Sequence, residues 1–165
     1  MLRVVDSGRD VATPALPAPR RIAREDTTFL VLNMMKSVID EGTGAGARAA
    51  GFALDAAGKS GTTNDLRDAW FVGFTPELLC VVWVGFDDNR AVGLSGSQAA
   101  LPIWTAFMKR ALAGHANVPF ADPPAGITFV DIDRDTGLLA GPNCPRVYRE
   151  AFLYGTEPVG ECEQH

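Results

Sequence analysis

A lysine and several hydroxyl side chains lie together in the stretch K-S-G-T-T, from Lys59 to Thr63. A lysine ammonium can assist proton transfer, hydroxyls can hold a carboxylate, and backbone N–H groups can stabilise a developing oxyanion. Gly58-Lys59-Ser60 is also the ending expected of a phosphate-binding loop, G-x-x-x-x-G-K-[ST]. The same residues are therefore consistent with two unrelated chemistries.

The neighbouring residues argue against the phosphate-binding loop. Its first glycine would stand where the chain has Ala53, and Ser60 is followed by turn residues and a β-type run instead of a helix. We interpret the stretch as a strand at the lip of a sheet, where Gly61 lets an extended peptide approach and pair with the backbone. Strand alternation would place Ser60 and Thr62 on one face and Lys59 on the other. On these residues alone, a solvated lysine in a turn stays open as the alternative.

The elements around this strand predict an α+β fold. The segment 25–39 repeats apolar residues at helical spacing, with Val31 and Met34 on its predicted buried stripe, and a flexible loop is expected over 42–51. The segment 103–112, before Gly114, has the same spacing, with Ile103 and Phe107 on its predicted buried stripe. Two β-type runs, 68–76 and 77–89, are joined by a link of hairpin length and should pair antiparallel. The second run is apolar without a break from Leu78 to Phe86, which is typical of a strand covered on both faces. We therefore predict an antiparallel sheet covered by helices on both faces.

The C-terminal part reads as a smaller unit. We predict a main domain over 1–118 and a β-hairpin-like extension over 119–165, with a turn at 135–137. Cys144 and Cys162 flank a loop-rich tail, where a disulfide would supply order; two unpaired thiols in a cytoplasmic protein are the alternative. Cys80, inside the apolar run, is expected to be buried and free. No metal site and no cofactor are predicted.

Composition excludes several classes of function. The 165 residues carry a formal net charge of −5 and no run of basic residues, which argues against a nucleic-acid surface. No apolar run is long enough to span a bilayer, and the N-terminus lacks the apolar region of a signal peptide. A cytoplasmic nucleotide-binding protein would survive as a hypothesis only if the chain bound ATP with Mg²⁺.

The stretch GKSGTTNDLRDAWFVGFTPELLCVVWVGFDDN resembles the K-[TS]-G box, and the two strands after it, of class A (bifunctional) penicillin-binding proteins. The resemblance extends upstream through REDTTFLVLNMMKSVIDEGTG and downstream through GLSGSQAALPIWTAFMKRAL to the tail. It implies the penicillin-binding, β-lactamase-like transpeptidase fold. It also implies a role in cross-linking peptidoglycan stem peptides by serine acyl transfer.

The resemblance assigns a role to each residue of the stretch. Lys59 would assist proton transfer, and the hydroxyls of Ser60 and Thr62 would hold the carboxylate of a stem peptide or of a β-lactam. The backbone N–H of Thr62 would be an oxyanion donor, and Gly61 and Thr63 would complete the substrate-binding strand. Family members often carry threonine at the position of Ser60; serine keeps the hydroxyl.

One departure from the family is large. Acyl transfer needs an S-x-x-K box with the serine nucleophile and an S-x-N box, and no serine of this chain has lysine or asparagine at that spacing. We therefore expect the K-[TS]-G wall of an extracytoplasmic transpeptidase cleft, inactive alone and partnered by a missing N-terminal lobe. A non-catalytic module that binds cell-wall peptides or proteins, derived from a transpeptidase, is the alternative.

Overall fold

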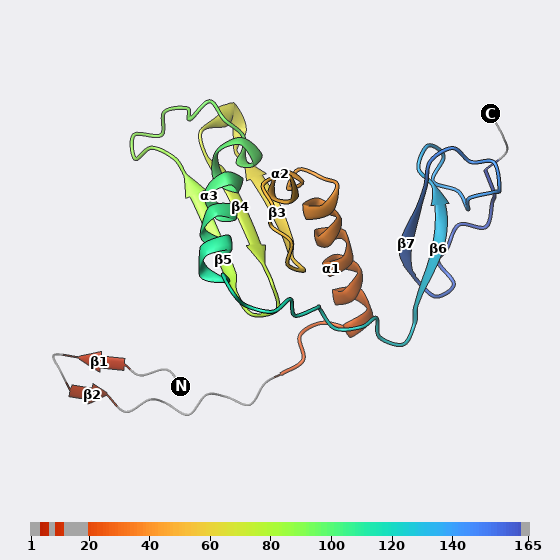
Figure 1. The fold of residues 1–165 in the computed structure, drawn as a ribbon, viewed down its shortest axis with the longest axis horizontal. Helices are drawn as coiled ribbons and strands as arrows, with labels where there is room; N and C mark the ends of the chain where they lie inside the picture. The colour runs from red at the N-terminus through yellow and green to blue at the C-terminus, as the bar shows by residue number, and fades with distance from the viewer. Residues whose placement is uncertain (1–3, 7–8, 12–19, 163–165) are drawn as a thin grey trace.

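The computed structural model describes residues 4–6, 9–11 and 20–162. Figure 1 shows a central sheet with helices, a separate β pair near the C-terminus and a short β pair near the N-terminus. In chain order the elements are β1 (Val4–Asp6), β2 (Arg9–Val11), α1 (Glu25–Asp40), α2 (Gly46–Ala49), β3 (Ala57–Thr62), the short 3-10 helix η1 (Asn64–Leu66), β4 (Ala69–Phe74), β5 (Leu79–Val84), α3 (Gly96–Ala111), β6 (Ile127–Asp133) and β7 (Val147–Leu153).

The central sheet is antiparallel, in the order β3-β4-β5. A tight turn joins β4 to β5, because Thr75 N donates to Leu78 O at 3.0 Å and Leu78 N donates to Thr75 Oγ1 at 3.2 Å. The predicted hairpin between the two β-type runs is therefore confirmed. So is the fold class, a mixture of helices with an antiparallel sheet.

The helix α3 covers one face of this sheet (Figure 1). Trp104 is fully buried there, with its ring centroid 5.2 Å from that of Phe71 and its Nε1 donating to Gly73 O at 3.1 Å. A side chain at Gly73 would place its Cβ only 2.6 Å from the Trp104 ring, so glycine is required for this contact. Ile103 and Phe107, predicted to lie on the buried stripe, are exposed; that stripe follows Ala100, Leu101, Trp104, Thr105 and Met108 instead.

The opposite face of the sheet carries exposed apolar side chains. Trp70, Leu79, Val81 and Trp83 are 39%, 61%, 50% and 45% exposed, and we call these four residues the outer sheet face. Cys80, Val82 and Val84 point the other way and pack against the core under α3. We predicted that both faces of the run from Leu78 to Phe86 would be covered. Within the described residues, only the face toward α3 is covered.

The predicted first helix is confirmed as α1, which lies along β3. Its last turn buries Ile39 in the core, whereas Val31 and Met34, expected on the buried stripe, are about half exposed. No helix in the described ranges is both long and apolar enough to cross a membrane.

The pair β6 and β7 lies beside α1, away from the central sheet (Figure 1). The rings of Phe29 and Phe129 meet edge to face with centroids 6.2 Å apart, and Asn33 Nδ2 donates to Glu150 Oε1 at 3.3 Å. The expected turn at 135–137 is present, with Gly137 at a φ of +70°. The segment directly after this turn forms only an isolated bridge to β6, however, and the partner of β6 over its whole length is β7.

Candidate functional site

The stretch from Lys59 to Thr63 ends β3, which is an edge strand of the central sheet among the described residues. Ser60 and Thr62 pair with Phe71 and Ala69 on the side that α3 covers, whereas Lys59 pairs with Val72 on the opposite side. The Lys59 side chain is exposed, and its Nζ donates to its neighbour's carbonyl oxygen, Ser60 O, at 2.8 Å. The strand therefore presents a cation and two hydroxyls on alternate sides of an exposed edge.

Thr43 contacts this strand from the loop after α1. Its Oγ1 lies 2.9 Å from Ser60 Oγ. The loop is held against the helix, because Gly44 N donates to Val38 O at 2.8 Å and a Cβ at Gly44 would come within 2.9 Å of the same oxygen. The hydroxyl partner of Ser60 is not a general base, so this contact orients Ser60 without activating it. Sequence reasoning treated this loop as flexible and missed Thr43.

The start of α3 fixes the other hydroxyl of the strand. Gly96 N donates to Thr62 Oγ1 at 3.1 Å, so the first turn of the helix meets the end of β3. A Cβ at Gly96 would lie 2.3 Å from Trp70 O and 2.6 Å from Gly61 O, which allows only glycine at this approach. Ser95 N donates to Gln98 Oε1 at 3.0 Å and helps to define where the helix begins. Gly96 is a second residue of the site that spacing alone did not reveal.

Thr63 is engaged by the turn that leads into β4. Its N donates to Asp68 O at 3.1 Å, its Oγ1 donates to Asp68 Oδ2 at 3.1 Å, and Asp68 N donates back to Thr63 Oγ1 at 2.8 Å. Asp68 Oδ1 also accepts a hydrogen bond from Trp83 Nε1 at 2.9 Å. The Thr63 side chain thus closes the turn, and the more accessible polar groups of the stretch are those of Lys59 and Thr62.

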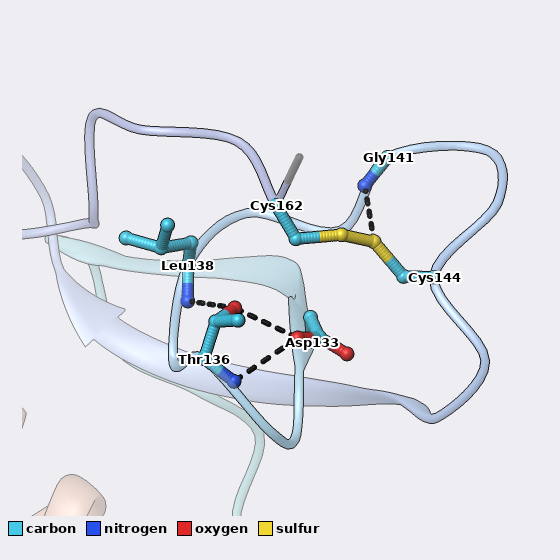
Figure 2. The surroundings of a disulfide bond; sticks show 6 residues. All are labelled: Asp133, Thr136, Leu138, Gly141, Cys144 and Cys162. Carbon is cyan, nitrogen blue, oxygen red and sulfur yellow. Dashed lines mark hydrogen bonds between the residues drawn. A yellow bond between two sulfur atoms is a disulfide. The ribbon is translucent and has the colours of Figure 1, made fainter. Parts of the chain in front are cut away.

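The three cysteines lie outside β3. Cys144 and Cys162 form a disulfide whose Cα atoms are 6.8 Å apart, within the normal range for a bridge (Figure 2). Cys80 is a free thiol, and its partial burial against the core raises its pKa above the ordinary value. Among the described residues, the one cluster of three side chains of metal-ligating type consists of the two bridged cysteines and Asp133, and it does not include Lys59 or its neighbours on β3.

Comparison with known proteins gives consistent matches along the chain. Residues 123–165 match the family model "Penicillin-binding protein 1A, C-terminal domain". Penicillin-binding protein 1A of Aquifex aeolicus is 37% identical over 162 residues, which cover 97% of this chain and 22% of that protein. The Pseudomonas aeruginosa protein of the same name is 41% identical over 139 residues, 82% of this chain and 17% of that protein.

A solved structure agrees with these sequences. The crystal structure of penicillin-binding protein 1A from Haemophilus influenzae superposes with a TM-score of 0.70 at 35% identity, and the match covers 84% of this chain and 22% of that one. The chain therefore spans about a fifth of the length of the relatives it matches.

Proposed function

Because the chain belongs to the class A penicillin-binding proteins, whose C-terminal part it matches, we propose that it forms one wall of a peptidoglycan transpeptidase cleft. The observation that carries this proposal is the placement of K-S-G-T on an exposed edge strand. Lys59 supplies a positive charge there, and Ser60 and Thr62 supply hydroxyls held in place by Thr43 and by Gly96.

Each group of the strand has a part in acyl transfer. Lys59, on the other side of the strand from the two hydroxyls, assists proton transfer and adds a positive charge to a cleft that binds an anionic substrate, a stem peptide or a β-lactam. The hydroxyls of Ser60 and Thr62 hold the substrate carboxylate, with Gly61 and Thr63 completing the binding strand. The backbone N–H of Thr62 donates to the oxyanion of the tetrahedral intermediate, a contribution of typically ~10²–10³ in rate for one donor.

The serine nucleophile comes from residues outside these 165. An acyl-enzyme needs a serine beside a general base, whereas Ser60 Oγ meets the hydroxyl of Thr43. The proposal therefore divides the cleft between this chain and a nucleophile-bearing lobe, working outside the cytoplasm. Within the chain, 1–118 would belong to the transpeptidase domain and 119–165 to a separate C-terminal extension.

A chimera tests the proposal directly. This chain would replace the matching C-terminal segment of the Haemophilus influenzae protein, and covalent labelling by a fluorescent penicillin would be followed in time. We expect the chimera to be labelled and Lys59→Ala to slow labelling by ~10²–10⁴-fold, the usual contribution of a positioned acid–base group. The chain by itself should give no adduct that survives boiling in detergent.

The matched control is Lys109→Ala. Lys109 is an exposed lysine of α3 that donates to Ala50 O, away from β3. Labelling of this variant should equal that of the unmodified chimera. If the Lys59→Ala variant is labelled as fast as the unmodified chimera, Lys59 has no role in acylation. An adduct on Ser60 in the isolated chain would mean that the nucleophile lies within these residues.

A further inference from the structure

A buried carboxylate lies against the disulfide of the C-terminal unit. Asp133, at the end of β6, is 1% exposed, and one of its carboxylate oxygens lies within 4.8 Å of the sulfur atoms of Cys144 and Cys162, which are themselves within that distance of each other. The three residues come from three separate segments that β6 and the bridge between Leu139 and Glu161 bring together. Figure 2 shows the carboxylate beside the bridge.

The two oxygens of this carboxylate differ in their surroundings. Oδ2 accepts hydrogen bonds from Thr136 N at 3.0 Å and from Thr136 Oγ1 at 2.7 Å, which hold the group in one orientation. Oδ1 is buried and has no hydrogen-bond partner among the described residues. Because an unpaired buried acceptor costs free energy, such an oxygen calls for a partner that the disulfide form does not provide.

The sulfur of Cys144 has a feature typical of thiolates. Gly141 N donates a hydrogen bond to Cys144 Sγ at 3.2 Å (Figure 2). Cys144 N donates in turn to Gly141 O at 3.2 Å and closes the turn. A backbone donor aimed at sulfur stabilises a negative charge there and so favours a metal-binding thiolate over a thiol. The turn therefore suits a charged sulfur as well as a bridged one.

We propose that reduction of the Cys144–Cys162 disulfide turns this cluster into a site for a divalent ion of the Zn²⁺ type. Its ligands are the two cysteine thiolates and Oδ1 of Asp133, and a solvent molecule takes the fourth tetrahedral position. Ligands ~2.0–2.3 Å from a tetrahedral ion lie roughly 3.3–3.8 Å apart. The two sulfurs, bonded to each other in the disulfide, would move apart to that spacing after reduction, and the carboxylate oxygen, no more than 4.8 Å from either sulfur, would move closer by roughly 1–1.5 Å at most. Sulfur donors favour zinc over magnesium or calcium.

The exchange balances in electrons and protons. A dithiol reductant gives two electrons and two protons to the S–S bond, producing two thiols and the disulfide of the reductant. Zn²⁺ then binds both sulfurs as thiolates and releases the two thiol protons to solvent. The disulfide links the two segments that carry Cys144 and Cys162, whereas the ion would link those two segments and also the end of β6 through Asp133.

Cobalt substitution tests the site on the full chain. The chain, reduced anaerobically with a phosphine and freed of it, would be titrated with Co²⁺ and then with Zn²⁺. We expect one equivalent to give the sulfur-to-metal charge-transfer and visible bands of tetrahedral thiolate coordination, and Zn²⁺ to abolish them. X-ray absorption of the Zn²⁺ form should show two sulfurs at ~2.3 Å and oxygen ligands at ~2.0–2.2 Å. The oxidised chain should give no such bands.

Variants identify the ligands. Cys144→Ser and Cys162→Ser should each lose the tetrahedral spectrum, whereas Cys80→Ser, which alters the free cysteine of β5, should keep it. Loss of an outer-shell partner costs ~10–100-fold in metal affinity, so Asp133→Asn, which removes a ligand charge, should weaken Zn²⁺ at least about 10-fold in competition with a chromophoric chelator. Absence of the bands in the reduced wild-type chain, or one sulfur in its X-ray absorption spectrum, would overturn the site without reference to any variant. If Asp133→Asn binds Zn²⁺ with unchanged affinity, the carboxylate of Asp133 is not a ligand of the ion.

Discussion

At the scale of single residues, the candidate site depends on glycines that let backbones meet. Gly96 brings the first turn of α3 against the end of β3, where its N–H donates to Thr62 Oγ1. Gly73 makes room for the ring of Trp104 in the same core. The position of the K-S-G-T strand relative to α3 is therefore set by the absence of side chains as much as by contacts between them.

Gly96→Ala should consequently destabilise the chain. Its Cβ would lie 2.3 Å from Trp70 O and 2.6 Å from Gly61 O, and overpacking of this kind typically costs ~1–3 kcal/mol. The measurement is the midpoint of urea unfolding followed by tryptophan fluorescence. Gly160→Ala is the control, because its Cβ would meet only Leu138 side-chain atoms at 3.5 Å and beyond. Equal midpoints for the two variants would show that α3 can move away from β3 at no cost.

At the scale of elements, β5 has two faces with different partners. Val82 packs against the core under α3, whereas Val81, next to it in sequence, belongs to the outer sheet face and is 50% exposed. The alternation follows from the strand geometry, since successive side chains point to opposite faces. The helix α3 covers one of the two faces of β5 and leaves the other exposed.

This asymmetry predicts a large loss of stability for one of two neighbouring substitutions and a small change for the other. Val82→Thr should lower the free energy of unfolding by ~1–3 kcal/mol, because it places a hydroxyl against the apolar core without a hydrogen-bond partner. Val81→Thr should change it by no more than about 0.5 kcal/mol, as is usual for surface positions. Both are isosteric, so each serves as the control of the other in denaturant titrations. A larger loss for Val81→Thr, measured at concentrations where the chain is monomeric, would mean that the outer sheet face is covered within the monomer.

At the scale of the whole molecule, the outer sheet face and the free edge of β5 lie together. β5 pairs only with β4 among the described strands, and Leu79 and Trp83 stand exposed on its surface. An apolar face beside an unpaired edge favours association with another polypeptide. In the proposed function that polypeptide is the remainder of the same transpeptidase domain.

The isolated chain should therefore self-associate. Light scattering after size exclusion should show a mass that rises with concentration in the micromolar range, because exposed apolar patches beyond a few hundred Å² promote association. Leu79→Lys combined with Val81→Lys should shift the chain toward monomer, and the same pair of lysines placed at Ala106 and Ala111, both exposed on α3, should not. A monodisperse monomer of unmodified sequence that melts cooperatively would contradict this expectation.

The amino-acid sequence by itself determined the elements and the motif. The apolar spacing of 25–39 predicts α1, the two β-type runs predict the hairpin of β4 and β5, and the residues around K-S-G-T predict a strand. These features are local, because helical and strand periodicities and a short link act over neighbouring residues. The resemblance to penicillin-binding proteins rested on the same contiguous residues.

Only the tertiary structure decided which surfaces meet. It placed Thr43 against Ser60, Gly96 against Thr62 and Asp133 beside the disulfide, and it paired β6 with β7 across a long loop. It also left one face of the sheet exposed where an unbroken apolar run had predicted cover on both. An apolar side chain is buried only where another element packs over it. The residue pattern of the strand does not specify whether such an element is present.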